Sequence, residues 1–235
     1  MRLNKYIAHA GICSRRKAAE LVKDGFIKLN GEVEKNPAVV VKEGDRVEYM
    51  GKEINPVKKK FYLLLNKPKN VITTMDDERG RKTVWDIVQE KVDTKIYPVG
   101  RLDRNTTGLL LMTNDGELIQ KLSHPSRKVK KIYEAVLDKP LAQKDIEEID
   151  KGVMLEDGMA EVDKISYIQE LPPNHIGIEL HSGKNRIIRR IFEHMGYEVI
   201  KLDRVFFAGL TKKDLPRGWS RFLKKEEVIM LKHFS

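Results

Sequence analysis

The sequence contains a single cysteine, Cys13, among 235 residues. One cysteine cannot form a disulfide within the chain, and it excludes multi-cysteine zinc and iron–sulfur sites. No apolar run approaches the ~20 residues of a membrane span, and the basic N-terminus lacks the apolar stretch of a secretory signal. We therefore expect a protein with no membrane partner in a reducing, cytoplasmic compartment, with Cys13 as a small buried side chain rather than a nucleophile.

Common nucleotide-binding and metal-binding motifs are also absent. There is no Gly-x-x-x-x-Gly-Lys-Ser/Thr phosphate loop and no Gly-x-Gly-x-x-Gly fingerprint, which argues against nucleotide hydrolases and dinucleotide enzymes. The six histidines show none of the spacings of zinc proteases or deaminases. Asp76-Asp77-Glu78 is better explained as a solvated acidic turn than as a metal site, and a metal-dependent nuclease lacks its carboxylate cluster. We expect neither a cofactor nor a metal.

Positive charge, by contrast, is in excess. Lys and Arg number 45 and Asp and Glu number 35, and the net charge of +10 favours a polyanionic partner such as nucleic acid. The segment 1–60 holds 14 cations and 8 acids and ends in Lys58-Lys59-Lys60, after Asn55-Pro56, where a helix or central strand would not continue. An apolar strand begins at Phe61. We predict two domains, 1–60 and 61–235, in a monomer.

The first domain is predicted to contain two helices and a hairpin. Apolar residues recur at helical spacing before Gly11 and again between Ser14 and Gly25, and Asn30-Gly31 is a strong hairpin signal. The second helix opens with Arg15-Arg16-Lys17, and three cations there oppose the helix dipole. They would suit a bound phosphate, and a solvated basic face is the alternative.

This order of elements resembles the RNA-binding domain named after the fourth protein of the small ribosomal subunit. The resemblance covers about residues 2–50, including the cations on the second helix and the hairpin that follows it. It implies that Arg15, Arg16 and Lys17 bind RNA.

In the second domain, strand-like and helix-like runs alternate irregularly, and several strands follow one another directly. This order favours a mixed, mainly antiparallel α+β fold over a doubly wound parallel sheet. The predicted strands cover residues 61–65, 109–113, 132–137, 160–167, 176–180 and 199–207. The predicted helices cover residues 83–90, 116–123, 142–151, 186–195 and 225–232.

A polar loop before the strand at 109–113 carries the strongest catalytic signal. It contains Arg101-Leu102-Asp103-Arg104 followed by Asn105-Thr106-Thr107-Gly108. An aspartate in such a loop often only caps a turn through its own backbone. Two flanking arginines would also stabilise the charged carboxylate that a nucleophile or base requires. The residues alone leave both roles for Asp103 open.

The segment from Gly100 to Leu111, followed by Thr113-Asn114-Asp115-Gly116-Glu117-Leu118, resembles the catalytic motif of ribosomal RNA pseudouridine synthases that modify single uridines. Two further blocks agree with this family. The first joins His124-Pro125-Ser126-Arg127 to Lys131-Ile132-Tyr133, and the second joins residues 183–190 to 202–205 and Gly209-Leu210. Ile187 departs from the pattern, because the family commonly has a polar residue there. With the first domain, the resemblance covers nearly the whole chain.

The resemblance implies the isomerisation of uridine to pseudouridine, in which the N1–C1′ bond breaks and a C5–C1′ bond forms without metal or cofactor. Asp103 would be the catalytic carboxylate, either attacking the sugar or removing its C2′ proton. Tyr133 would stack on the flipped uracil and assist loss of the C5 proton, although without the resemblance it is equally a strand-core aromatic. Arg189 would pair with Asp103, or else belong to a basic helix face.

The resemblance also implies contacts with the rest of the RNA. Arg101 would fill the gap that the uridine leaves when it is extruded from its stack. Leu210 would pack against the base, although core packing is the ordinary role of a lone leucine. Arg186 and Arg190, from the third block, would bind RNA.

Ribosomal RNA is therefore the expected partner. The segments 124–127, 152–158 and 215–219 look closer to enzymes of large-subunit (23S) RNA, and a small-subunit (16S) enzyme is the alternative. The rival from another class is a non-catalytic RNA-binding factor of ribosome assembly. The set of Asp103, Tyr133 and Arg189 argues against this rival, because binding alone does not require an acid in a basic RNA groove.

Overall fold

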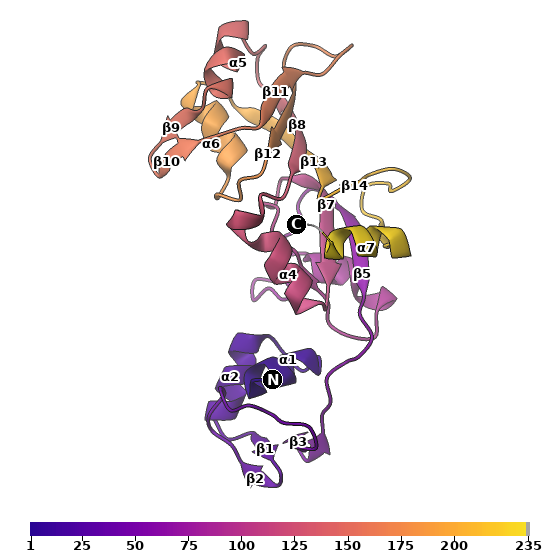
Figure 1. The fold of residues 1–235 in the computed structure, drawn as a ribbon. Coiled ribbons are helices and arrows are strands. Elements are labelled where there is room, and N and C mark those ends of the chain that lie inside the picture. The colour runs from indigo at the N-terminus through magenta and orange to yellow at the C-terminus, as the bar shows by residue number, and fades with distance from the viewer. Residues whose placement is uncertain (234–235) are drawn as a thin grey trace. The chain divides into compact units, whose positions relative to one another are not determined.

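The computed structural model describes residues 1–233, and the chain divides into two compact units, Met1–Lys60 and Phe61–Ser235. Figure 1 follows the chain through both units. Among the described residues, no helix combines the length and the apolar character needed to cross a membrane. Each unit has its own hydrophobic core.

The first unit packs two helices and a small sheet around one core. The elements are α1 (Leu3–His9), α2 (Arg15–Lys23), β1 (Ile27–Leu29), β2 (Glu32–Val33), β3 (Val47–Tyr49) and β4 (Lys52–Glu53), with sheet order β2-β1-β3-β4. The Ser14 side chain caps α2 by accepting a hydrogen bond from the Lys17 backbone N–H at 3.3 Å. Asn30 and Gly31 have positive φ angles of 54° and 88°, as the predicted hairpin turn requires.

The second unit contains helices and strands in irregular order. Its helices are α3 (Val84–Val88), α4 (Gly116–Ser123), α5 (Gln143–Asp150), α6 (Ile187–His194) and α7 (Lys225–Lys232), with short 3₁₀ turns η1 (Gln89–Lys91) and η2 (Pro125–Arg127). Its strands are β5 (Tyr62–Lys67), β6 (Tyr97–Pro98), β7 (Thr107–Thr113), β8 (Lys131–Leu137), β9 (Val153–Leu155), β10 (Gly158–Ala160), β11 (Lys164–Tyr167), β12 (His175–Leu180), β13 (Val199–Phe207), β14 (Leu210–Thr211) and β15 (Ser220–Phe222).

A nine-stranded sheet forms the frame of the second unit within the described residues. Its main path is β11-β12-β8-β13-β7-β5-β15, with β14 paired to β13 and β6 paired to β7. β13 and β7 run parallel, and the other pairs of this sheet are antiparallel. A separate hairpin joins β9 and β10. The predicted mainly antiparallel α+β fold is confirmed.

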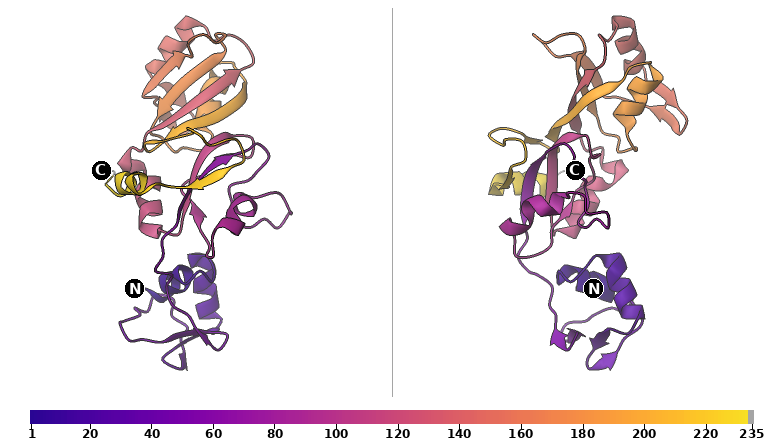
Figure 2. Two further views of the ribbon diagram at one scale, coloured as in Figure 1. Left: turned by 90° about the vertical axis from the view of Figure 1, so that its right-hand side faces the viewer. Right: turned by 180° about the vertical axis from the view of Figure 1, so that it is seen from behind.

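Two hydrophobic cores lie on the two faces of the central strands. Alternate residues of β5 and β7 enter different cores, with Leu63, Leu65, Leu110 and Met112 in one and Leu64, Leu109 and Leu111 in the other. Helices α3, α5 and α6 contribute to the first core, and α4 and α7 to the second. Figure 2 shows these helices from two further sides of the sheet. Residues 109–112 of β7 are all apolar because both faces of this strand are covered.

One predicted strand is wrong. Residues 160–167 were expected to form a single strand, but Ala160 ends β10 and Lys164 begins β11. Ala160 pairs with Val153 in the small hairpin, whereas Ile165 pairs with Ile178 in the large sheet. The chain therefore leaves one sheet and enters another within three residues, which the apolar pattern alone does not reveal.

The parallel contact between β7 and β13 is unusually close at Gly108. Arg204 pairs with Gly108, and a Cβ atom at Gly108 would lie 2.3 Å from the Arg204 carbonyl oxygen. The φ angle of Gly108 is +105°, which also favours glycine. Glycine thus allows β13 to approach β7 directly after the loop that carries Asp103.

Candidate active site

Asp103 lies in a loop that backbone and side-chain hydrogen bonds hold in place. The Thr73 hydroxyl donates to the Leu102 carbonyl at 2.7 Å and accepts from the Leu102 N–H at 3.2 Å. The Asn70 N–H donates to the Arg104 carbonyl, and the Thr106 N–H donates to that of Asp103. The loop is therefore anchored on both sides of Asp103 by its backbone, while the half-buried Asp103 side chain is not used as an anchor.

A fully buried lysine supports the same loop. Lys67 ends β5 with no exposed surface, and its ammonium group donates to the carbonyls of Val71 at 2.8 Å, Pro68 at 3.1 Å and Arg104 at 3.4 Å. Burial lowers the pKa of Lys67 to about 8, with the charge of Asp103 raising it and that of Arg217 lowering it. Lys67 is therefore close enough to Asp103 for their charges to interact.

Asp103 opens onto a cavity of about 730 Å³. Arg101, Tyr133, Arg186 and Arg189 also line this cavity, so the structure brings together five of the residues that the sequence predicted. Tyr133 lies on β8 opposite Ile178 and Arg204 and is 9% exposed. A carboxylate, an aromatic side chain and several cations therefore share one cavity.

Arg189 does not form the expected ion pair with Asp103 among the described residues. From α6, its guanidinium donates instead to the Val199 carbonyl at 2.6 Å. Burial lowers the pKa of Arg189, as does the charge of Arg186, whereas the charge of Asp103 raises it. Arg189 thus interacts with Asp103 through space rather than by direct contact.

Other predicted residues lie outside the cavity lining. Leu210 is buried in the second core of this unit, where it pairs with Phe207. Arg190 binds the Asp157 carboxylate through both terminal nitrogens, at 2.5 and 3.1 Å.

In the first unit, the cations at the start of α2 are exposed. Arg15, Arg16 and Lys17 all lie on its first turn, and Lys17 forms an ion pair with Glu20 at 3.2 Å. Their side chains are therefore accessible to a ligand in solvent.

The acidic turn and the histidines offer no metal site. Asp77 accepts hydrogen bonds from the backbone and guanidinium of Arg81, as expected for a turn. No group of three or more His, Cys, Asp and Glu side chains could hold a metal ion within residues 1–233.

Comparison with known proteins identifies the family. The model of the RNA pseudouridylate synthase family matches residues 61–194, and the S4 domain model matches residues 1–47. The chain belongs to the RNA pseudouridine synthase family. The predicted resemblance is thus confirmed for both parts of the chain, and the protein is an isomerase that acts on RNA.

Relatives match the synthase over nearly its whole length. The ribosomal large subunit pseudouridine synthase B of Bacillus subtilis (strain 168) is 40% identical over 98% of this chain and 95% of its own. An uncharacterized RNA pseudouridine synthase of Aquifex aeolicus (strain VF5) is 36% identical over 98% of this chain and 93% of its own. A solved pseudouridylate synthase covers 98% of this chain and 99% of its own with a TM-score of 0.70 and 24% identity, so the fold is shared.

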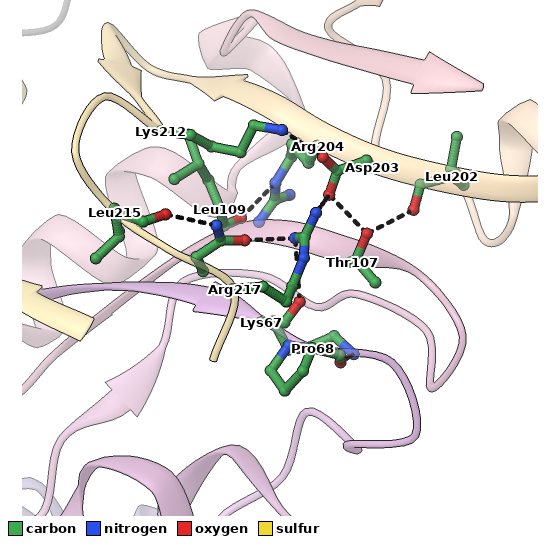
Figure 3. Close-up of polar contacts among 11 residues, drawn as sticks. Lys67, Pro68, Thr107, Leu109, Leu202, Asp203, Arg204, Lys212, Leu215 and Arg217 are labelled. Atoms are coloured by element: carbon green, nitrogen blue, oxygen red, sulfur yellow. Dashed lines mark hydrogen bonds and ion pairs between the residues drawn. The ribbon is translucent and has the colours of Figure 1, made fainter. Parts of the chain in front are cut away.

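The synthase also contains a polar network that sequence reasoning missed (Figure 3). The Asp203 carboxylate accepts hydrogen bonds from Thr107 at 2.6 Å and Lys212 at 2.5 Å and forms an ion pair with Arg217 at 2.8 Å. Arg217 in turn donates to the side chain of Asn66. Burial raises the pKa of Asp203, but these hydrogen bonds outweigh it and hold the pKa below its ordinary value.

This network joins β5, β7 and β13 to the segment 212–217, at the point where the loop that carries Asp103 enters β7. Thr107 is the first residue of β7 and pairs in register with Asp203 of β13. Asn66 belongs to β5 and also donates to the Leu215 carbonyl at 2.7 Å. Asp203 lies between apolar residues and cations in β13, and its partners come from distant segments, so no clear signal of the network is visible in the sequence.

Proposed function

We propose that the synthase converts a uridine of large-subunit (23S) ribosomal RNA to pseudouridine in the cytoplasm, as a monomer, with Asp103 as the catalytic carboxylate. The substrate is supported by the large-subunit synthase of Bacillus subtilis, whose similarity extends over both units at 40% identity. The reaction rearranges the atoms of one nucleotide, so it requires no oxidant, donor or metal.

The catalytic assignment of Asp103 rests on the position of its carboxylate at the cavity and on the lack of a structural partner for it within residues 1–233. Among the described residues, its carboxylate accepts no hydrogen bond and forms no ion pair, although it lines the cavity from an anchored loop. An acid held at the edge of a cavity without a structural partner is available to act on a sugar. Lys67 and Arg189 lie close enough for their charges to interact with that of Asp103.

Three further side chains serve the extruded nucleotide. Tyr133, at the cavity wall, stacks on the uracil and assists loss of the C5 proton after the C5–C1′ bond has formed. Arg189 acts on Asp103 through the interaction of their charges rather than by direct contact. Arg101 is exposed at the same cavity and fills the gap in the RNA, which offsets part of the few kcal/mol that extrusion costs. Contact between the base and the buried Leu210 stays a prediction.

The remaining predicted cations bind parts of the RNA other than the nucleotide that enters the cavity. Arg186 lies at the cavity. Arg190 lies one turn further along α6 and forms an ion pair with Asp157. Residues 1–60 act as an RNA-binding domain, in which Arg15, Arg16 and Lys17 meet phosphates.

A deletion strain tests this function directly. Pseudouridines of both ribosomal RNAs are mapped after deletion of the gene and after complementation with wild type or Asp103→Asn. We expect one large-subunit pseudouridine to disappear and to return with wild type alone. A missing small-subunit pseudouridine would favour the 16S alternative, and return of the modification with Asp103→Asn would remove Asp103 from its role. An unchanged pattern in the deletion strain would contradict the proposed substrate.

A further inference from the structure

Besides the predicted site residues, the cavity wall contains Lys131, Lys184 and Arg204, of which Lys184 forms an ion pair with Asp157. Arg204 of β13 is 2% exposed, and Lys131 at the start of β8 is half-buried. The Nε of Arg204 donates to the Leu109 carbonyl at 2.7 Å, and its guanidinium lies over the Phe207 ring at 4.6 Å. These partners carry no negative charge.

Lys131 likewise has only neutral partners. Its ammonium group donates to the carbonyls of His181 at 2.7 Å, Val129 at 2.9 Å and Ser182 at 3.4 Å. Burial, with a smaller effect from the charge of Arg204, lowers its pKa to about 8, so the two cations are near neighbours. The charge of Asp163 acts in the opposite direction, but that carboxylate is hydrogen-bonded to His181 at 2.6 Å.

Among the described residues, no carboxylate forms an ion pair with Lys131 or Arg204. The Nη2 atom of Arg204 is buried without a hydrogen-bond partner. Asp103 and Glu161, the acids of the cavity lining, form no ion pair with Lys131 or Arg204 in the described part of the chain. Burying like charges together costs free energy, and an unpaired guanidinium nitrogen adds to that cost. An anionic ligand would relieve both.

We propose that Lys131 and Arg204 form a phosphate subsite, which holds an RNA backbone phosphate adjacent to the nucleotide in the cavity. This inference rests on the proposed function, because it assumes that a nucleotide of the RNA substrate enters. A phosphate fits better than the uracil ring, since it offers full negative charge and several acceptor oxygens to a guanidinium and an ammonium group. The cavity volume of about 730 Å³ lies within the range of pockets for whole small molecules, about 300–1,000 Å³.

Substitution in the RNA tests the subsite without altering the protein. RNA hairpins that contain the mapped uridine are prepared with an uncharged methylphosphonate directly 5′ or directly 3′ to it, or at a distant control position. We expect one adjacent substitution to weaken binding to wild type on the order of 10- to 100-fold, and the distant one much less. Equal effects of adjacent and distant substitutions would overturn the subsite.

The Arg204→Gln variant then assigns the contact. In this variant the sensitive methylphosphonate should cause little further loss, because the contact is already missing, whereas Arg204→Lys should retain part of the sensitivity. If the substitution weakens binding equally in wild type and Arg204→Gln, Arg204 does not hold that phosphate. Conversion of the unmodified hairpin by wild type is measured in parallel, so that failure of the proposed function is recognised separately.

A second measurement needs neither turnover nor a variant. The reactivity of the Lys131 amine toward an acylating reagent is followed by mass spectrometry with uridine 5′-phosphate or uridine present. A bound phosphate should protect Lys131, so protection is expected with the nucleotide and not with the nucleoside. Equal protection by both ligands, or none by either, would contradict the subsite.

Discussion

The cations at the start of α2 in the first unit and the buried cations of the second unit differ in their surroundings. Arg15, Arg16 and Lys17 are exposed on one helical turn, whereas Lys67 and Arg204 are almost completely buried. Exposed charges are screened by salt and add to affinity for any polyanion in proportion to the phosphates they meet. Buried charges interact strongly over short distances and must be matched by specific partners.

This difference indicates two uses of positive charge in one RNA-modifying chain. The ammonium group of Lys67 donates hydrogen bonds to three carbonyls around the loop of Asp103. It therefore fixes the conformation of the loop, and its charge also interacts with that of Asp103. The cations of α2 hold no such carbonyls. We therefore assign chemistry to the second unit and general RNA affinity to the first, and the predictions below test this assignment.

The largest effect is expected at Asp103. Asp103→Asn keeps the shape of the side chain but removes the carboxylate, so turnover should fall on the order of 10³-fold or more while RNA binding is retained. Tritium release from C5-labelled uridine in RNA measures turnover. Asp150→Asn, at an exposed position on α5, is the matched control and should keep full activity. Substantial turnover by Asp103→Asn would place the chemistry elsewhere.

β7 and β13 approach each other so closely at Gly108 that one added methyl group should destabilise the second unit. Gly108→Ala would place its Cβ 2.3 Å from the Arg204 carbonyl oxygen and at an unfavourable φ. We expect a loss of about 2–4 kcal/mol in the free energy of unfolding, measured by urea denaturation. Gly218→Ala is the control, because its φ is also positive but nothing lies within 4 Å, and it should cost only about 1 kcal/mol. If the two variants lost the same free energy of unfolding, β7 and β13 would be able to move apart and accommodate the added methyl group.

Sequence reasoning located the elements of this fold better than the partners of its buried charges. Helical spacing and the polar caps gave α4 at residues 116–123 and α7 at 225–232 with the observed bounds. Local patterns of this kind depend on neighbours within one or two turns, so they are visible in the sequence. The hairpin at Asn30-Gly31 was predicted for the same reason.

The buried cations could not be found in this way. Lys131 and Arg204 belong to blocks that resemble the family and Lys67 ends a strand, but only the assembled sheet shows that Lys67 and Arg204 are buried and Lys131 half-buried. Arg204 reaches the Leu109 carbonyl across 95 residues of sequence, through the parallel pairing of β13 with β7. The position of Asp103 was predicted from a motif, whereas the hydrogen bond of Arg189 to Val199 depends on packing that no local pattern encodes.

A smaller effect is expected from the protonation of Lys67. Its pKa is lowered to about 8 in the folded protein, chiefly by burial, whereas an unfolded lysine has a pKa of about 10.4. Between these values only the unfolded state keeps the proton, so this group makes the folded state more stable as the pH rises from about 8 to about 10. Lys67→Met removes that contribution.

Urea denaturation across this pH range checks the contribution of Lys67. The stability of wild type relative to Lys67→Met should increase with pH, while Lys131, present in both proteins, cancels. Lys69→Met, which removes an exposed lysine from the adjoining turn, is the control variant and is measured over the same pH range. A constant difference between wild type and Lys67→Met would mean that Lys67 titrates as an exposed lysine.

The division between affinity and chemistry is tested most directly by the triple variant Arg15→Ala, Arg16→Ala, Lys17→Ala. Its RNA affinity and the single-turnover rate of pseudouridine formation at saturating RNA are measured over a range of salt concentrations. We expect weaker binding, a log–log salt slope smaller in magnitude by about two to three units, and an unchanged single-turnover rate. Normal binding and an unchanged salt slope, combined with a slow single-turnover rate, would contradict the assignment of affinity to the first unit and chemistry to the second.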